Sequence, residues 1–221
     1  MKEEKNILND SVERGISDRD LSLSEIPDLD LYIDQILTLV ATKNQTAAQR
    51  YKDNILTKTM INNYSKEGLL TPVKGKKYTK EQIVQMLLIY SMKSSLSIGD
   101  IHRVLDGARS EGVTGERLMQ SYDRHLADKG QIRSLVASSV KKINREGQLE
   151  SEDGSDFLVA LLDLLSYSAY LRGVALELLE ARYPAVEDEK EKEKEKKEKA
   201  EKDKKEKDKT QKSASEGDSE I

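Results

Sequence analysis

The 221-residue chain contains no cysteine and no tryptophan, and it has a single phenylalanine. Without cysteine it forms neither disulfides nor thiolate metal sites. That suits a reducing cytoplasm, where we expect the protein to act. The core must therefore be built mainly from Leu, Ile, Val and Met, with tyrosine. Once a polar tail is set aside, a chain of this length can bury one sizeable core or two small ones.

Long uninterrupted hydrophobic runs are also missing. The first ten residues, MKEEKNILND, are charged and have no apolar centre, so they do not have the pattern of a signal peptide. The longest apolar stretch, residues 157–179, is broken by Asp163, Arg172 and Glu177. We therefore expect no membrane-spanning helix and no membrane partner.

Motifs for catalysis and metal binding are absent as well. His102 and His125 are the two histidines of the chain. They fall on different predicted helices, without metal-ligand spacing. There is no phosphate-binding loop and no nucleophile elbow. The sequence predicts that the protein is not an enzyme and that it holds no metal and no cofactor.

One short segment is strongly basic within an acidic chain. The formal net charge is −4, yet residues 50–80 carry eight Lys and Arg against two Asp and Glu, a net charge of +6. A focused basic patch on an acidic chain favours a local contact with a polyanion. Lysines that simply solvate a loop are the alternative, and charge alone does not separate the two.

Residues 56–78 have the pattern of a short helix, a glycine stop and a lysine-rich loop. Thr57 stands at the N-cap position of this helix and Gly68 just past its end. The residues that we expect to face the core are Met60, Ile61 and Tyr64. A turn at Gly75 then makes residues 73–78 a short wing.

The outer face of this helix is polar and basic. The residues predicted to contact duplex DNA are Lys58, Thr59, Asn62, Asn63 and Lys66 from the helix, and Lys74, Lys76 and Lys77 from the wing. Asn pairs bidentately with adenine, and Lys reaches guanine or phosphate. Two successive asparagines, which are poor helix formers, indicate a use beyond stability. The alternatives are hydrogen bonding of either Asn to the neighbouring loop and, for the wing, a solvated hairpin.

Helical spacing of apolar residues predicts several further helices, so the fold class is all-α. Asp30 is expected to cap a first helix that contains Ile33, Ile36, Leu37 and Val40. The pairs Thr79–Gln82 and Ser97–Asp100 have the spacing of capping boxes at the start of two more helices. The glycines expected to end or interrupt helices are Gly107, Gly112, Gly130 and Gly147.

The last predicted helix, about residues 155–183, is apolar nearly all round. Such a helix must be buried on more than one side. A small bundle rarely covers one helix completely, so we favour a homodimer that uses this helix.

Four segments are predicted along the chain. They are a mobile N-terminal arm at 1–28, a winged helix-turn-helix domain at 29–110, a C-terminal helical region for dimerisation at 111–183, and a Lys/Glu-rich tail at 184–221. The arm is expected to dock through Leu21, Leu23 and Ile26. The tail composition cannot bury a core, and it is typical of a disordered segment or of a single solvated helix.

The block from Leu56 to Leu105 resembles the MerR-type winged helix of bacterial transcriptional regulators. The matching positions are Thr57, Tyr64, Gly68-Leu69-Leu70-Thr71-Pro72, Lys77-Tyr78, Thr79 and Leu96-Ser97-Ile98. The family's usual arginine, two positions before the tyrosine, is Asn62 here, and no effector-binding signature of these regulators follows residue 110.

Roughly residues 20–110 are also similar to an uncharacterised family of Gram-positive bacteria, domain of unknown function 1836. That likeness rests on Asp30-Leu31-Tyr32, the string Met60-Ile61-Asn62-Asn63-Tyr64, and Gly68-Leu69.

The MerR resemblance implies sequence-specific binding of duplex DNA and a role as a transcriptional regulator, with any small-molecule effector unknown. Two alternatives remain open. One is a protein-interaction module built on a helix-turn-helix-like domain. The other is a small-molecule sensor with its pocket in the C-terminal bundle.

Overall fold

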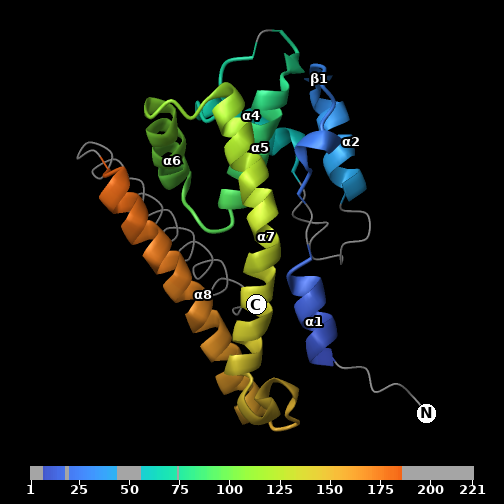
Figure 1. The fold of residues 1–221 in the computed structure, drawn as a ribbon, viewed down its shortest axis with the longest axis vertical. Helices are drawn as coiled ribbons and strands as arrows, with labels where there is room; N and C mark the ends of the chain where they lie inside the picture. Colours follow the sequence, from blue (N-terminus) through green and yellow to red (C-terminus); the bar gives the residue numbers. More distant parts are fainter. Residues whose placement is uncertain (1–6, 18–19, 44–55, 74, 186–221) are drawn as a thin grey trace, which may run out of the picture. The chain divides into compact units, whose positions relative to one another are not determined.

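The computed structural model describes residues 7–17, 20–43, 56–73 and 75–185. Within these ranges the protein is mostly helical, with one short two-stranded ribbon (Figure 1), which confirms the all-α class. The chain divides into two compact units, Met1–Leu178 and Leu179–Ile221, and both the core and the ribbon belong to the first unit. Lys74 of the predicted wing and the Lys/Glu-rich tail from residue 186 lie outside the described residues.

The described helices range from single turns to nearly thirty residues. In chain order the elements are α1 (Ile7–Gly15), the 3-10 turn η1 (Leu23–Glu25), β1 (Leu31–Tyr32), α2 (Ile33–Lys43), α4 (Lys58–Lys66), β2 (Lys77–Tyr78), α5 (Lys80–Met92), α6 (Ile98–Ser110), α7 (Gly115–Ile143), the 3-10 segment η2 (Arg145–Glu150) and α8 (Gly154–Arg182). Both predicted capping boxes are present. Thr79 with Gln82 begins α5, and Ser97 with Asp100 begins α6.

The two strands come from distant parts of the chain. β1 and β2 are antiparallel, with Leu31 opposite Tyr78 and Tyr32 opposite Lys77. The strand before α2 therefore holds the strand that follows α4, and the predicted wing is not a local hairpin. The expectation that Asp30 caps a helix is wrong, because α2 begins only at Ile33, after the strand.

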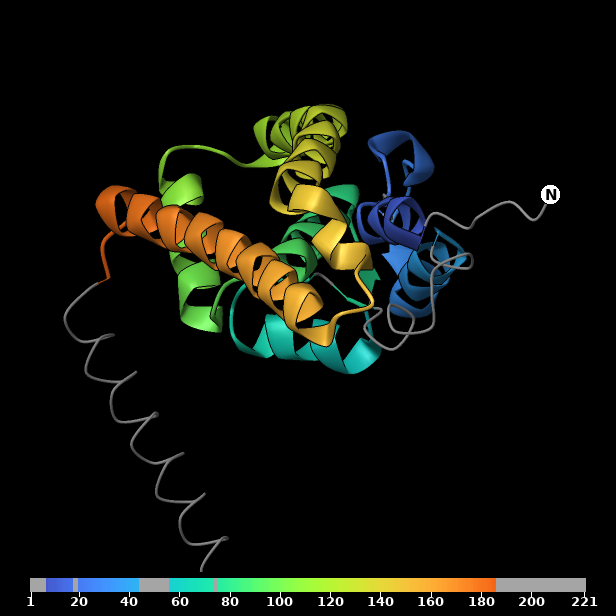
Figure 2. The same ribbon diagram turned by 90° about the horizontal axis from the view of Figure 1, so that it is seen from below.

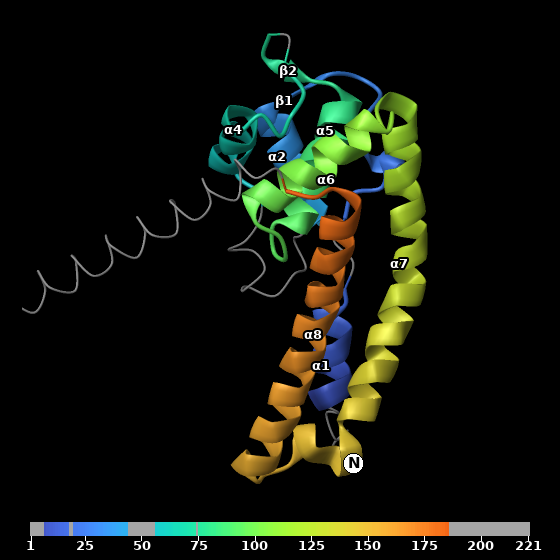
Figure 3. The same cartoon turned by 90° about the vertical axis from the view of Figure 1, so that its left-hand side faces the viewer.

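The core is centred on α5 and extends to α2, α4, α6 and the start of α7 (Figure 3). The residues of α5 that are buried include Ile83, Val84, Met86, Leu87 and Ile89. The predicted arm also reaches this core, since Leu21 and Ile26 are only 4% and 1% exposed. Tyr122 of α7 donates a hydrogen bond from Oη to the Leu21 carbonyl oxygen at 2.7 Å. The segment before β1 is thereby fastened to α7.

Two of the expected glycine breaks are wrong. Gly107 lies inside α6, which continues to Ser110, and Gly130 lies inside α7, which is one continuous helix. A glycine in a helix costs about 1 kcal/mol relative to alanine, which is too little to stop a helix that packs well on either side. Gly112, with φ of +74°, is the residue past the end of α6.

The last helix, α8, begins and ends close to the predicted positions but is mostly exposed within one chain. Arg172 anchors it by donating from Nε to the Ser95 carbonyl oxygen at 2.5 Å. With 29 residues and a mean hydropathy of 1.4 in its most apolar window, α8 is long and apolar enough to cross a membrane, and only 6% of that window is buried. The expectation that its charges exclude a span by composition is therefore wrong, and burial of α8 by a second copy stays a prediction. The apolar core helix of a soluble protein meets the same composition criterion.

Candidate nucleic-acid interface

The start of α4 is fixed by the predicted cap. The Thr57 hydroxyl accepts a hydrogen bond from the Met60 backbone N–H at 3.2 Å. Ile61 and Tyr64 are buried at 0% and 3% exposure, while Met60 is half-buried. The predicted inward face of the helix is confirmed, and it turns the polar face outward.

The end of α4 is fixed by a glycine-dependent turn. Gly68 has φ of +72°, in the left-handed region that glycine tolerates. The Leu69 N–H donates to the Tyr64 carbonyl oxygen at 2.9 Å, and the Gly68 N–H donates to the Ser65 carbonyl oxygen at 3.2 Å. These two bonds form a Schellman motif. The side chain of Leu69 is 1% exposed, so the turn is pinned into the core.

All five residues of α4 that are predicted to contact DNA are exposed. They are Lys58, Thr59, Asn62, Asn63 and Lys66. Lys58 Nζ lies 4.0 Å from the Asp34 carboxylate of α2, and both side chains are largely exposed, so this ion pair is weak. Lys66 forms no ion pair with any residue that the structure describes. The polar face of α4 is therefore free to meet a partner.

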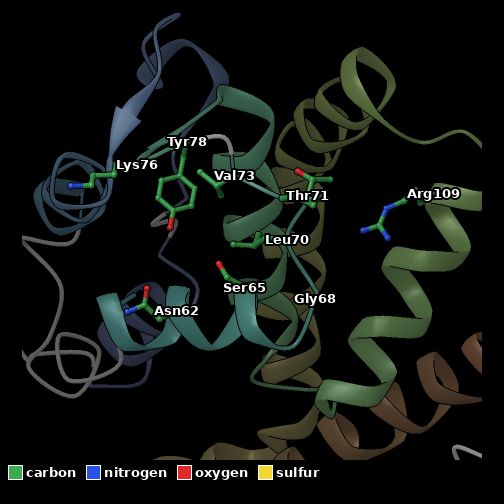
Figure 4. A pocket seen from close by; sticks show the side chains of 11 residues that line it. Asn62, Ser65, Gly68, Leu70, Thr71, Val73, Lys76, Tyr78 and Arg109 are labelled. Atoms are coloured by element: carbon green, nitrogen blue, oxygen red, sulfur yellow. The ribbon is translucent and has the colours of Figure 1, made fainter.

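A groove of about 640 Å³ lies between α4, the loop that follows it, and the ribbon. Asn62 and Ser65 project from α4 toward Tyr78, and Arg109 points inward from α6 (Figure 4). Lys76 lines the groove at its ribbon side. The structure therefore brings two predicted residues, Asn62 and Lys76, to one surface.

Arg109 is the groove residue that sequence reasoning missed. Its guanidinium Nη1 donates to the Asp106 carboxylate at 2.7 Å, within the same helix. In the sequence this pair has the ordinary pattern of a surface helix, with acid and base three residues apart. Only the approach of the end of α6 to the loop after α4 places Arg109 on the same groove as Asn62.

Two buried glutamines of α5 hold the loop that forms the floor of the groove. Gln82 Nε2 donates to the carbonyl oxygens of Thr71 and Pro72, each at 3.1 Å. Gln85 Oε1 accepts from the Thr71 N–H at 3.0 Å. Both glutamines are 5% exposed, and buried hydrogen bonds of this kind are costly to break. The sequence identified Gln82 only as a helix cap and did not single out Gln85.

The ribbon presents its lysines differently from one another. Gly75, with φ of +85°, provides the predicted turn. The ammonium group of Lys77 lies 5.1 Å from the centre of the Tyr32 ring, which is cation–π distance. Lys76 is exposed, and its side chain extends away from the centre of the groove (Figure 4). Lys80, at the start of α5, pairs with Asp28 at 2.5 Å. The Lys77–Tyr32 contact thus joins the two strands of the ribbon, and Lys76 is unpaired among the described residues.

Tyr64 lies beneath the polar face of α4. Its hydroxyl oxygen is buried and has no hydrogen-bond partner among the described residues. Burial raises the pKa of the Tyr64 hydroxyl above its ordinary value, and the nearby Tyr90 adds to the effect. The ring therefore packs as a neutral aromatic that ties α4 to the core.

Metal-binding geometry is not found in the parts of the chain that the structure describes. No group of three His, Asp or Glu side chains is arranged to hold an ion there. His102 is half-buried on α6 with Nδ1 3.8 Å from the Asp106 carboxylate, and His125 is exposed on α7.

The fold and the groove define a helical domain in which a short capped helix lies beside a two-stranded ribbon. Residues 21–125 match the model of a family described as Domain of unknown function (DUF1836). The match begins where the chain enters the core at Leu21 and ends within α7, so it contains the whole groove. No curated protein and no solved structure matches the chain.

Proposed function

We propose that the protein binds duplex DNA in a sequence-specific manner through α4 and the ribbon, and that it acts as a bacterial transcriptional regulator. One observation carries the proposal. The adjacent, exposed Asn62 and Asn63 lie on a helix that is capped at both ends, and buried glutamines fix the loop that follows this helix beside a lysine-bearing ribbon. Such rigidity is what base reading requires, because side chains must meet base edges within hydrogen-bond tolerance.

The residues divide into two roles. Asn62 and Asn63 are placed to read base edges in the major groove, which admits an α-helix. Lys66 on α4 and Lys76 on the ribbon add positive charge to the same side of the domain, which suits contacts to phosphates, and Arg109 lines the groove while paired with Asp106. Lys77 supports the ribbon over Tyr32 and adds to the same basic surface.

A protein-interaction module is the second candidate function. The exposed apolar residues of α8 favour it, since large apolar patches mark protein contacts. The outer face of α4 is polar, however, which favours nucleic acid at the groove itself. The two candidates thus concern different surfaces of the chain. The small-molecule sensor stays a prediction.

The test begins by selecting binding sites from a random duplex pool with the full-length chain. Fluorescence anisotropy then gives affinities for the selected site and for random DNA. Asn62→Ala or Asn63→Ala is expected to cost roughly 1–3 kcal/mol on the selected site and little on random DNA, because each removes a base contact.

The phosphate contacts are tested by a salt series with the same duplexes. Replacing Lys76 and Lys77 with Ala is expected to weaken binding to all sequences alike. It should also flatten the slope of log K against log salt by about 0.9 for each lost phosphate contact. The matched control replaces Lys141 and Lys142, two exposed lysines at the end of α7, and should leave the slope unchanged. If selection enriches no sequence and both double variants bind DNA as the wild type does, the proposal fails.

A further inference from the structure

The hairpin of α7 and α8 carries an apolar surface that the other described elements leave uncovered. Its exposed large hydrophobic residues are Ile132, Leu135, Phe157, Leu158, Val159, Leu162, Leu165, Tyr167, Tyr170, Leu171, Val174 and Leu178. Each is between 39% and 74% exposed. At roughly 100 Å² apiece they present on the order of 1,000 Å², whereas the largest apolar patch of a typical monomer is about 300–600 Å². In the view of Figure 2, α8 lies across the front with no other described element over it.

Four of these twelve residues, Tyr167, Leu171, Val174 and Leu178, follow the repeat of a coiled coil. The repeat consists of Ala160, Leu164, Tyr167, Leu171, Val174 and Leu178, at alternating spacings of 4 and 3 residues. This is the spacing of a heptad seam, in which each side chain packs between residues of a facing helix. The seam begins inside the chain, where Ala160 is fully buried, and then opens until Leu178 is 66% exposed. We call these six residues the α8 seam.

The α8 seam touches α7 at Tyr167. Ser139 Oγ donates to Tyr167 Oη at 3.2 Å, and the two helices run antiparallel (Figure 3). Beyond Tyr167, the seam residues Leu171, Val174 and Leu178 are 54%, 58% and 66% exposed. One chain thus leaves the C-terminal part of the α8 seam uncovered.

A different stripe of α8 is polar. Asp156, Asp163, Tyr170 and Glu177 recur every seven residues, so they share one face of the helix. This acidic stripe suits contact with water. It limits the apolar surface of α8 to the rest of the circumference, which includes the α8 seam. Asp163 and Arg172 near the middle of α8 also disfavour a lipid environment, where charged side chains are expensive.

We propose that the α8 seam is covered by the same seam of a second copy of the chain, so that two α7–α8 hairpins form a four-helix bundle. The exposed apolar residues of the whole hairpin, rather than the four exposed seam residues alone, supply the area of about 800 Å² that a stable interface buries on each partner. A regular seam of Leu, Val and Tyr is also self-complementary across a twofold axis, where the same patch serves both subunits. The proposal goes beyond DNA binding and stands on different residues.

The test compares two positions on different sides of α8 in the full-length chain. Sedimentation velocity from about 1 to 50 µM, a range that detects weak self-association, should show a dimer for the wild type. Leu171→Glu should weaken the dimer at least tenfold. Leu165→Glu, 57% exposed and on the side of α8 away from the seam, should leave it unchanged. Because Leu171 is itself 54% exposed, its variant should keep the helical circular dichroism of the wild type.

A second measurement uses the absence of native cysteine. Val174→Cys should cross-link efficiently to a second copy with a short bismaleimide, and Leu165→Cys, on the side of α8 away from the seam, should not. A wild type that is monomeric throughout the concentration range overturns the proposal, as does a dimer weakened equally by both Glu variants. Flotation of a monomeric wild type with neutral phosphatidylcholine vesicles would make lipid the occupant instead.

Discussion

At the scale of the residue, Tyr64 shows how the fold treats a polar group that it must bury. Tyr64 anchors α4 by burying its ring, yet its hydroxyl has no partner among the described residues. A buried hydroxyl without a hydrogen bond costs about 1–3 kcal/mol of desolvation. The ring is thus what stabilises α4, and the hydroxyl opposes it.

Tyr64→Phe is therefore expected to leave stability at pH 7 unchanged or to raise it by up to about 1 kcal/mol, as measured by urea denaturation. The raised pKa adds a pH signature. The raised pKa contributes fully to the free energy of unfolding at any pH below the ordinary pKa of 10.0. This contribution is lost as the pH rises through the higher folded-state pKa. The wild type should thus weaken more than the variant on going to strongly alkaline pH. A loss of more than about 1 kcal/mol in the variant at pH 7 would show that the hydroxyl has a stabilising partner.

At the scale of the element, local signals are predictable and tertiary ones are not. Thr57, the Thr79–Gln82 box and the Ser97–Asp100 box are contained within four residues each, so sequence alone locates three helix starts. The pairing of β1 with β2 joins segments on either side of α2 and α4, and two-residue strands have no periodicity to detect. The free-energy cost of glycine in a helix can be read from the sequence, so Gly130 has the pattern of a helix break. The tertiary packing of α7, which outweighs this cost, cannot be read from the sequence.

Two glycines provide a matched test of how these helices are stabilised. Gly68→Ala should destabilise the protein by about 1 kcal/mol, because φ of +72° strains any residue with a Cβ. The added Cβ itself would have room, since its nearest neighbour is His102 Cε1 at 3.9 Å. Gly130→Ala should instead stabilise by about 0.5–1 kcal/mol, as a better helix former within α7. Thermal or urea unfolding of both variants measures the two signs. Destabilisation by Gly130→Ala would contradict the description of α7 as an ordinary continuous helix.

The candidate site divides in the same way between what sequence predicts and what it cannot. The outward face of α4 follows from helical periodicity once Ile61 and Tyr64 are assigned to the core. The roles of Arg109 and Gln85 do not follow from helical periodicity, because they depend on the approach of α6 and α5 to the loop after α4. Each has an unremarkable local pattern, so only the three-dimensional arrangement reveals it.

At the scale of the whole molecule, the chain separates two surfaces of opposite character. The family match, residues 21–125, contains the groove with its amides and basic side chains. The α7–α8 hairpin carries the exposed apolar seam, which lies beyond the matched residues. We propose that the first surface meets DNA and the second meets another copy of the chain. A dimer would present two copies of α4 to one duplex, which raises affinity through effective concentration.

The central claim is that duplex DNA contacts α4 and the ribbon. The most direct measurement is the map of backbone amide chemical-shift changes when the labelled full-length protein is titrated with a selected duplex. We predict that the changes concentrate at Asn62, Asn63, Lys76 and Arg109, and that a scrambled duplex produces smaller changes at the two asparagines. Changes confined to α7 and α8, or no change with either duplex, would contradict the claim.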